Sequence, residues 1–479
     1  MKYIILSLFL TILVTNAVRL GHDSALNKGL KYYRGVDKLS ASSVSDPSPM
    51  WYTQQVDHFD PSNSDTFQQQ YYVNSTYYAP GGPIFLVLGG EGPLTAGYVT
   101  GHFVVNLYAQ KFNALIVAVE HRFYGKSMPK PDLSTENLKF LTTQQALADY
   151  ATFRQYIAQK YNTGNGKWIS FGGSYSGSLS AWMRLKYPHL IDGAIATSAP
   201  VLPQLDFPEY FEVVSTSVGP TCSAVIANVT ATVTQMLAND RASVQSIFNA
   251  CDPIVTDLDV ATFMESLSGG VAETVQYNND NNKYTMSNIT TMCAQLEQGD
   301  PLQAFASFNN RYNTFSGANC TTSSYNSMIQ SMQDVDPNGD NAASRSWTWQ
   351  TCIEYGYFQV GESPNQPFSS TITLDYFLQQ CTDIFGPPGY QYQPAIDWII
   401  ADYGATDYQG SNVILPNGLV DPWHILGVLQ TTNPNIQISI IPEGAHCSDL
   451  YPPKPNDPAS LIATRQKEVA LISSIIYSK

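Results

Sequence analysis

A serine with the surroundings of a catalytic nucleophile stands at position 174. The run from Trp168 to Ala181 reads WISFGGSYSGSLSA: an apolar stretch, two glycines, the serine, and a segment compatible with a helix. A sharp turn between strand and helix exposes the hydroxyl of such a serine, and it needs small residues two positions away on each side. Gly172 meets this need, and Ser176 stands where glycine is usual. The run predicts a nucleophile elbow; the competing interpretation is an ordinary Gly-Ser loop.

The serine needs a histidine and an acid, and both follow in the order typical of this turn. Asp421 lies in PNGLVDPW after the apolar run NVIL, and His446 lies in EGAHCSD after the apolar run IQISII. Parallel strands place such loop residues at one edge of the sheet. His424 is a rival, but it shares a loop with Asp421. We predict a Ser174–Asp421–His446 triad; the competing interpretations are a turn aspartate and a surface histidine.

The three residues would divide the work of acyl transfer. His446 would take the proton of the serine hydroxyl, and Asp421 would orient the imidazole and stabilise its charged form. The oxyanion of the intermediate needs backbone donors, and the N–H of Tyr175 at the start of a helix is one. The second is expected from the run GGEG after an early strand, at Gly90 or Glu91. A simple glycine turn is the alternative for GGEG.

The surrounding elements are those that could hold such a site. Short apolar runs alternate with helical patterns over residues 51–205, which predicts a parallel sheet covered on both faces. The amphipathic segment 141–161 is predicted to be a helix, with Thr142 or Thr143 as its cap. The fold class is therefore α/β, of the α/β-hydrolase type. The predicted strands lie at 83–88, 114–119, 168–171, 192–199, 412–415 and 436–441, and a closing helix at 457–478.

The middle of the chain has a different character. Helical segments such as 223–237 and 241–248 alternate with loops rich in Asn, Asp and Ser, and strand patterns fade. This predicts a helical, disulfide-bonded cap inserted into the core. The predicted division is a signal peptide at 1–17, a flexible leader or propeptide at 18–50, the first part of the core at 51–205, the cap at 206–380, and the second part of the core at 381–479.

The N-terminus and the overall charge limit the partners. Lys2 precedes a short apolar run from Ile4 to Val14, and small residues ending at Ala17 offer a cleavage site, as in secretory signals. A membrane anchor is the alternative, but the run is too short to span a bilayer. A net charge of −15 disfavours nucleic acid and anionic membranes. We expect no stable membrane insertion, and the oligomeric state, a homodimer included, stays open.

Passage through the secretory pathway would allow disulfide formation and N-glycosylation, so the cysteines and the sequons are considered together. Six of the seven cysteines fall between residues 222 and 381, so disulfides are expected in that segment, and one cysteine is left over. No two cysteines have the close spacing of a zinc site, and we expect neither a metal nor another cofactor. The sequons are at Asn74, Asn228, Asn288 and Asn319.

Several runs, spread in order over nearly the whole chain after the signal, resemble one family of serine peptidases. They are QQVDHFD (54–60), LGGEGP (88–93), VEHRFYGKSMP (119–129), LTTQQALADY (141–150), FGGSYSGSLSAWMRLKYPHLIDGAIATSAPV (171–201), NGLVDPW (417–423) and GAHCSDL (444–450). The chain resembles the family of lysosomal prolyl carboxypeptidase, dipeptidyl-peptidase II and thymus-specific serine protease. GGSYSGSLSAW is most similar to the thymus-specific branch.

The resemblance implies a serine exopeptidase that cleaves short peptides after proline, within one or two residues of a terminus. It also implies a lysosomal or extracellular location in the secretory pathway. Cys447 would stay free beside His446, at a place where many relatives have a second histidine. The disulfide pairs that the resemblance implies are Cys222–Cys293, Cys251–Cys320 and Cys352–Cys381.

The expected substrate pocket departs from the family at one position. A proline ring needs an apolar wall, and Trp423 could supply one face. Proline-specific relatives carry Met where this chain has Ser178. A change of this size shifts discrimination by ~1–3 kcal/mol, which would relax a strict preference. Activity near pH 5 would also require His446 to stay neutral, because an unperturbed histidine has a pKa of ~6.5.

Two other functions remain compatible with the residues. An esterase or lipase on the same fold could use the same triad, although the family-specific runs disfavour it. A binding protein that kept the hydrolase scaffold is a further alternative, and the intact triad argues against it. The sequence does not decide which terminus of the peptide is trimmed.

Overall fold

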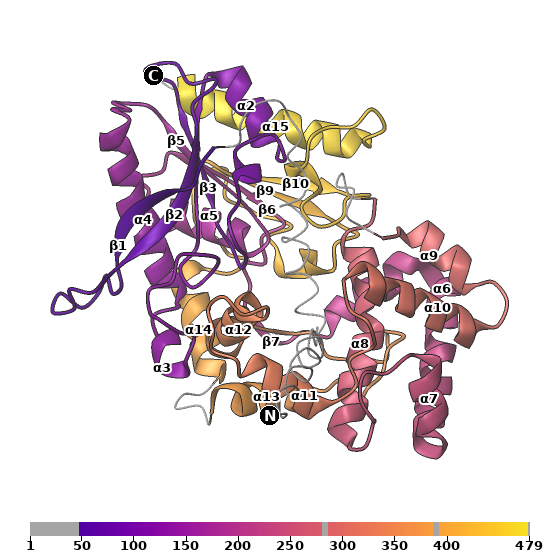
Figure 1. The fold of residues 1–479 in the computed structure, drawn as a ribbon. Coiled ribbons are helices and arrows are strands. Elements are labelled where there is room, and N and C mark those ends of the chain that lie inside the picture. The colour runs from indigo at the N-terminus through magenta and orange to yellow at the C-terminus, as the bar shows by residue number, and fades with distance from the viewer. Residues whose placement is uncertain (1–46, 280–285, 387–391, 478–479) are drawn as a thin grey trace, which may run out of the picture.

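A computed structural model describes residues 47–279, 286–386 and 392–477 (Figure 1). The predicted signal peptide at 1–17 and residues 18–46 of the predicted leader lie outside the described residues. The described part contains an eight-stranded sheet, made of β1 (Met50–Gln55), β2 (Thr66–Asn74), β3 (Ile84–Leu88), β4 (Leu115–Val119), β5 (Trp168–Gly173), β6 (Gly193–Thr197), β9 (Val413–Gly418) and β10 (Ile436–Ile441).

The strand order is β1-β2-β4-β3-β5-β6-β9-β10. β2 runs antiparallel to both of its neighbours, and every pair from β4 to β10 is parallel. The loops that follow β3, β5, β9 and β10 therefore leave the sheet at the same edge. This arrangement confirms the predicted α/β-hydrolase fold.

β3 shows why helices must cover both faces of the sheet. Ile84, Leu86 and Leu88 belong to one hydrophobic cluster. Phe85 and Val87 belong to another on the opposite face. Successive side chains of a strand alternate between faces, so a continuous apolar run needs cover on both sides. The first cluster includes α4 (Thr143–Lys160) and α5 (Tyr175–Lys186), and the second includes α2 (Val105–Phe112) and α15 (Ala459–Tyr477).

The first two strands of the sheet were not predicted from the sequence. β1 begins at Met50, inside the predicted leader. Both strands carry buried glutamines, which break the apolar alternation that identifies a strand. Gln54 donates a hydrogen bond to Gln69 Oε1 at 3.1 Å, and Gln69 donates to the Glu120 carbonyl at 2.8 Å. Burial of these amides is tolerated because each is hydrogen-bonded.

Between β6 and β9 the described chain is mainly helical (Figure 1). The predicted cap begins at residue 206, which lies in β7 (Gln204–Asp206), a strand that pairs with β8 (Gly356–Phe358), and it ends at residue 380, inside a helix that ends at Phe385. Gly386, with φ 87°, ends that helix. The helices are α6 (Glu209–Asn239), α7 (Arg241–Ile247), α8 (Asp257–Gln276), α9 (Ile289–Leu296), α10 (Pro301–Phe315), α11 (Tyr325–Met332), α12 (Ala342–Gln350), α13 (Leu374–Phe385) and α14 (Tyr392–Tyr403).

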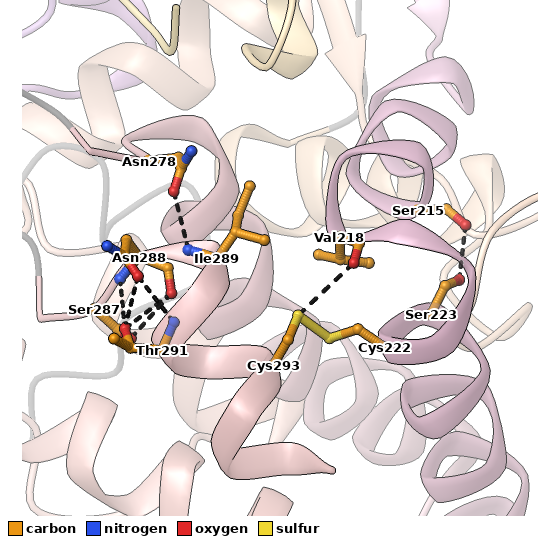
Figure 2. The surroundings of a disulfide bond; sticks show 10 residues. All are labelled: Ser215, Val218, Cys222, Ser223, Asn278, Ser287, Asn288, Ile289, Thr291 and Cys293. Atoms are coloured by element: carbon orange, nitrogen blue, oxygen red, sulfur yellow. Dashed lines mark hydrogen bonds between the residues drawn. A yellow bond between two sulfur atoms is a disulfide. The ribbon is translucent and has the colours of Figure 1, made fainter. Parts of the chain in front are cut away.

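Three disulfides join elements of this helical region, and they are the pairs that the resemblance implies. Cys222–Cys293 links α6 to α9, as Figure 2 shows. Cys251–Cys320 and Cys352–Cys381 are the other two pairs. Disulfides persist in oxidising compartments, so the protein belongs to the secretory pathway.

One helix in the described part of the chain, α6, has the length and composition that would allow it to cross a membrane. Such a property is weak evidence by itself. The helix is bent at Gly219, where φ is 80°, directly before Pro220. Its apolar side chains, such as Ile226 and Val233, are buried in the same cluster as α8 and α9. They contribute to the interior of the helical region.

Candidate active site

Ser174 stands at the end of β5 in a strained conformation. Its φ is 60° and its ψ is −134°, which a residue other than glycine rarely adopts. Its N–H donates to the Thr197 carbonyl at 3.0 Å, which fixes the turn against β6. A Cβ atom on Gly172 would lie 2.0 Å from the Ser176 carbonyl oxygen, so only glycine fits there. The local chain thus forms the tight turn that the sequence predicts.

Asp421 and His446 meet in the structure. Asp421 follows β9, His446 follows β10, and His446 Nδ1 lies 2.7 Å from Asp421 Oδ2. Both side chains are buried. The rival His424 instead places its Nδ1 2.6 Å from the backbone carbonyl of Asp421. The parallel order of the two strands brings His446, and not His424, to the Asp421 carboxylate.

The serine loop and the histidine loop are in contact. A Cβ atom on Gly173 would lie 2.9 Å from Cys447 Sγ, so the neighbours of Ser174 and His446 touch. The Cys447 N–H donates to Ser198 Oγ at 3.0 Å. No hydrogen bond joins Ser174 Oγ directly to the imidazole within the described residues. Catalytic hydrogen bonds are often long without substrate and tighten when it binds.

The charge balance around His446 favours its protonated form. Burial lowers the pKa of His446, but the Asp421 carboxylate beside it, with a contribution from Cys447, raises the pKa well above 6.5. Burial also raises the pKa of the Cys447 thiol, so the thiol is neutral at neutral pH. Asp421 is therefore the charge that holds the imidazolium. The direction is opposite to the neutral His446 that activity near pH 5 would need.

The residues predicted as oxyanion donors lie on the elements next to Ser174. Tyr175 is the first residue of α5, so its N–H has no partner within the helix. Glu91 and Tyr175 line the same cavity as Ser174. The Glu91 N–H interacts with its own carboxylate. A Cβ on Gly90 would lie 3.2 Å from Ser176 Cβ, so Gly90 packs directly on the first turn of α5.

The side chain of Tyr175 joins the core to the helical region. Its hydroxyl lies 3.0 Å from His121 Nε2 and accepts a hydrogen bond from Gln350 Nε2 at 2.9 Å. Gln350 is the last residue of α12. Burial raises the pKa of Tyr175 and lowers that of His121 to about 4, so both groups are neutral at neutral pH. This network holds the side chain of the residue that follows Ser174.

A cavity opens at Ser174, between the sheet edge and the helical region. Aromatic rings form much of its wall: Trp423 packs edge-on against Tyr357 at 5.4 Å, and Tyr175 packs on Trp347 at 5.3 Å. Ser178 is not among the described residues that line it. Ser178 is completely buried in α5, and its hydroxyl has no hydrogen-bond partner. The structure thus brings Trp423 to the cavity wall but not Ser178.

The sequence analysis missed the contribution of α8. The Gln276 carbonyl accepts a hydrogen bond from the His446 N–H at 2.8 Å, and Gln276 Oε1 accepts from Trp423 Nε1 at 3.0 Å and from the Tyr210 hydroxyl at 2.8 Å. The last turn of α8 is therefore attached to the histidine loop. The helical period of α8 was readable from the sequence, but its contact with a loop 170 residues later was not.

The four sequons differ in their accessibility. Asn228 and Asn319 are exposed. Asn74 Nδ2 donates to the Val99 carbonyl at 2.7 Å. Asn288 caps α9 by accepting a hydrogen bond from the Thr291 N–H at 2.9 Å, as Figure 2 shows. The side chains of Asn228 and Asn319 are exposed in the folded protein, whereas the side chains of Asn74 and Asn288 make hydrogen bonds to the backbone.

Comparisons with known proteins identify the family of this chain. Residues 54–468 match the family described as Serine carboxypeptidase S28. The chain is 33% identical to the thymus-specific serine protease of Homo sapiens over 448 residues, which cover 89% of this chain and 86% of that protein. It is 29% identical to the lysosomal Pro-X carboxypeptidase of Mus musculus, with 91% of each chain covered. The solved proline iminopeptidase of Mycobacterium smegmatis is 11% identical, with a TM-score of 0.42 over 89% of this chain and 98% of that chain. The chain belongs to the S28 family and is a serine peptidase.

Proposed function

We propose that the protein is an exopeptidase that cleaves short peptides after proline, with Ser174 as nucleophile, His446 as general base and Asp421 as its partner. The observation that carries the proposal is the 2.7 Å contact between His446 Nδ1 and Asp421 Oδ2, together with a strained Ser174 that lines a cavity. The specificity for proline is supported by the aromatic wall and by the name of the Pro-X carboxypeptidase relative.

The proposed reaction has two halves. Ser174 Oγ attacks the scissile carbonyl while its proton passes to His446, and the oxyanion accepts hydrogen bonds from the N–H groups of Tyr175 and Gly90. His446 then gives the proton to the leaving amine as the C–N bond breaks. Water, deprotonated by His446, attacks the acyl-enzyme and releases the acid product and Ser174. Asp421 stays ionised throughout and stabilises the imidazolium.

The helical region supports trimming at a chain end rather than cleavage within long chains. The cavity walls include α6, α8, α12 and α13 as well as the sheet edge. A site walled on several sides by helices admits the end of a peptide chain more readily than a folded protein. Within the secretory pathway, we propose that the enzyme acts in lysosomes or outside the cell, and the raised pKa of His446 favours the second location.

The test uses the purified, secreted protein and a fluorophosphonate probe. We expect the probe to label the wild type and to leave Ser174→Ala unlabelled, while Ser62→Ala, in an exposed loop, behaves like the wild type. Mass spectrometry of short proline-containing peptides should show loss of one or two terminal residues. Labelling at Ser174 together with intact peptides and rapid hydrolysis of simple acyl esters would contradict the proposal and favour an esterase.

A further inference from the structure

Two buried carboxyl groups meet at the histidine loop (residues 442–451). Asp449 lies in the short helix η5 (Ser448–Leu450) of this loop, three residues after His446, and Glu468 lies on α15. Both residues are almost completely buried, at 1% and 0% exposed, and their side chains are hydrogen-bonded to each other. Two carboxylates that share a buried site repel each other too strongly for both to be ionised. The pair therefore holds one proton.

The other partners of the pair show which carboxyl group carries the proton. The Thr197 hydroxyl donates to Asp449 Oδ2 at 2.5 Å, so Asp449 is a hydrogen-bond acceptor. The Tyr108 hydroxyl donates to Glu468 Oε2. Glu468 Oε1 is buried, and no donor among the described residues reaches it. A buried oxygen of this kind is satisfied when it carries a hydrogen and donates it, so the proton lies on Glu468 and points to Asp449.

The cation beside the pair does not replace this proton. Arg465 lies one helical turn before Glu468 on α15, and its side chain pairs with Asp457 at 2.6 Å. It also donates to three carbonyl groups of the histidine loop, those of Ser448, Asp449 and Tyr451, at 2.9–3.1 Å. Within the described residues, none of its hydrogen bonds reaches the Asp449 or Glu468 carboxyl group. Arg465 thus fixes the backbone of the loop, and the acid pair keeps its own proton.

The electrostatic surroundings agree with a single negative charge on the pair. Burial raises the pKa of Glu468 well above 4.5, the charge of Asp449 adds to this rise, and the Tyr108 hydrogen bond and Arg465 oppose it. Burial also raises the pKa of Asp449, although its hydrogen bonds lower it. Burial raises the pKa of the other titratable groups near the pair, Tyr108 and the Cys447 thiol, so both are neutral at neutral pH.

The pair is part of the link between the histidine loop and the nucleophile turn. Thr197, whose hydroxyl is bonded to Asp449, also accepts the Ser174 N–H with its backbone carbonyl at 3.0 Å. A Cβ atom on Gly173 would overlap Leu450 Cδ1, so the residue after Asp449 packs on the nucleophile turn. The position of η5 therefore sets how the histidine loop lies on this turn.

We infer that Glu468 is a positioning residue: the proton that it shares with Asp449 holds the histidine loop on the nucleophile turn, and the loss of this proton to solvent at rising pH displaces His446 from Ser174. Loss of the proton leaves two carboxylates in contact, and their repulsion separates η5 from α15. The inference rests on the proposed roles of Ser174 and His446. It adds an alkaline limit to the activity, beside the acidic limit that protonation of His446 sets.

The rate at which a fluorophosphonate labels Ser174 in the full secreted enzyme tests this limit, because the probe has no titrating group. From acidic to alkaline pH, the wild-type rate should rise as His446 loses its proton and then fall by about tenfold or more as the acid pair loses its own. Glu468→Gln has no such proton to lose, since its amide nitrogen donates to Asp449 and its amide oxygen accepts from Tyr108. This variant should keep the wild-type maximum within about twofold and show no alkaline fall.

Two further variants control this comparison. Glu443 also joins the histidine loop to α15, through a 2.7 Å hydrogen bond from the Ser460 hydroxyl, but it is exposed. Glu443→Gln should therefore keep both sides of the wild-type pH profile. Asp449→Asn places an amide donor beside groups that themselves donate, so we expect labelling to fall by about tenfold at every pH, or the folded protein to be lost. Wild-type labelling of Asp449→Asn would place the proton on Asp449 and overturn the assignment.

A Glu468→Gln protein that fails to fold, or that labels as slowly as Asp449→Asn, would show that the charge of Glu468 is needed, and it would overturn the inference. The same alkaline behaviour in the wild type and in Glu468→Gln, whether a fall or a plateau, would overturn it too. The expected pH profiles together with uncleaved peptides would support the inference and contradict the proposed function, because labelling needs no peptide.

Denaturant unfolding is a second measurement, and it does not depend on Ser174. The pKa of Glu468 is raised in the folded state above its ordinary value of ~4.3, so the stability that it contributes is complete below that value and is lost as pH rises through the raised pKa. The unfolding midpoint of the wild type should therefore fall relative to that of Glu468→Gln as pH rises. If Ser174 is never labelled, the proposed function fails, and parallel midpoints would then overturn the inference as well.

Discussion

At the scale of single residues, the pairing of His446 with Asp421 has two consequences. It orients the imidazole, and it raises the pKa of His446 against the opposing effect of burial. The base form of His446 is the one that can accept the proton of Ser174. A raised pKa therefore lowers the fraction of His446 that is in the base form at low pH, and it shifts the pH range of activity toward neutral and alkaline values.

The pH dependence of kcat/KM tests this balance. The base form of His446 is lost as pH falls through its raised pKa, so we expect activity to decline from an apparent pKa above 6.5. Asp421→Asn removes the carboxylate that raises the pKa. This variant should move the decline to lower pH, and its residual rate should be reduced by roughly 10⁴ because the imidazole loses its orientation. A wild-type optimum near pH 5 would contradict the structure at this residue.

At the scale of elements, the turn between β5 and α5 depends on the absence of a side chain at Gly172. The Ser176 carbonyl oxygen would lie 2.0 Å from a Cβ there. The Ser176 hydroxyl donates to the Leu88 carbonyl at 2.7 Å and ties the helix start to β3. Serine in place of the usual glycine thus adds a hydrogen bond while it meets the requirement for a small residue.

Substitution at this turn has a predictable order of severity. Gly172→Ala forces the turn open, and we expect loss of fluorophosphonate labelling and a lower unfolding free energy, by about 1–3 kcal/mol or more. Ser176→Gly, the matched control, removes only the hydrogen bond to Leu88 and should cost about 1 kcal/mol with labelling retained. Thermal unfolding and labelling of the two variants side by side give the comparison. Full labelling of Gly172→Ala would show that the turn has room for a methyl group.

Sequence patterns predicted some of the strands and helices correctly and missed others. β3 and β4 are continuous apolar runs, and they were predicted within one residue of their ends. Thr142 caps α4, with its side chain accepting from the Gln145 N–H. β1 and β2 were missed because buried Gln54 and Gln69 find partners on other strands. A sequence pattern assigns a polar residue to the surface, because its hydrogen-bond partner lies far away in the sequence and is not known in advance.

At the scale of the whole molecule, the site depends on how the helical region is held over the sheet. α8 contributes Glu273 and the Gln276 carbonyl, and α12 contributes the Gln350 amide that holds Tyr175. The disulfide Cys222–Cys293 joins α6 to α9, and both helices contact α8. A loosened helical region would therefore disturb the cavity as well as the fold.

Removal of this cross-link tests the coupling. The disulfide closes a loop of 71 residues, and its loss in a Cys222→Ser, Cys293→Ser double variant should lower the unfolding free energy by about 2–4 kcal/mol. Ser223→Ala, beside Cys222, leaves the cross-link and loses only the contact of its hydroxyl with Ser215, shown in Figure 2. It should cost about 1 kcal/mol or less. Denaturant unfolding of both secreted variants measures the difference, and equal values would mean that packing alone holds α6 on α9.

The sequence by itself determined the tight turn at Ser174, the order of Ser174, Asp421 and His446 along the chain, and the parallel core, because these follow from local residue types and from the period of apolar positions. Only the tertiary structure decided that His446 and not His424 meets the Asp421 carboxylate, that Ser178 lies outside the cavity wall, and that α8 faces the site. A helical pattern shows which residues share a face, but not what that face packs against. The cavity wall brings together Glu91 and Glu273, which lie far apart in the chain, and no local pattern encodes such packing.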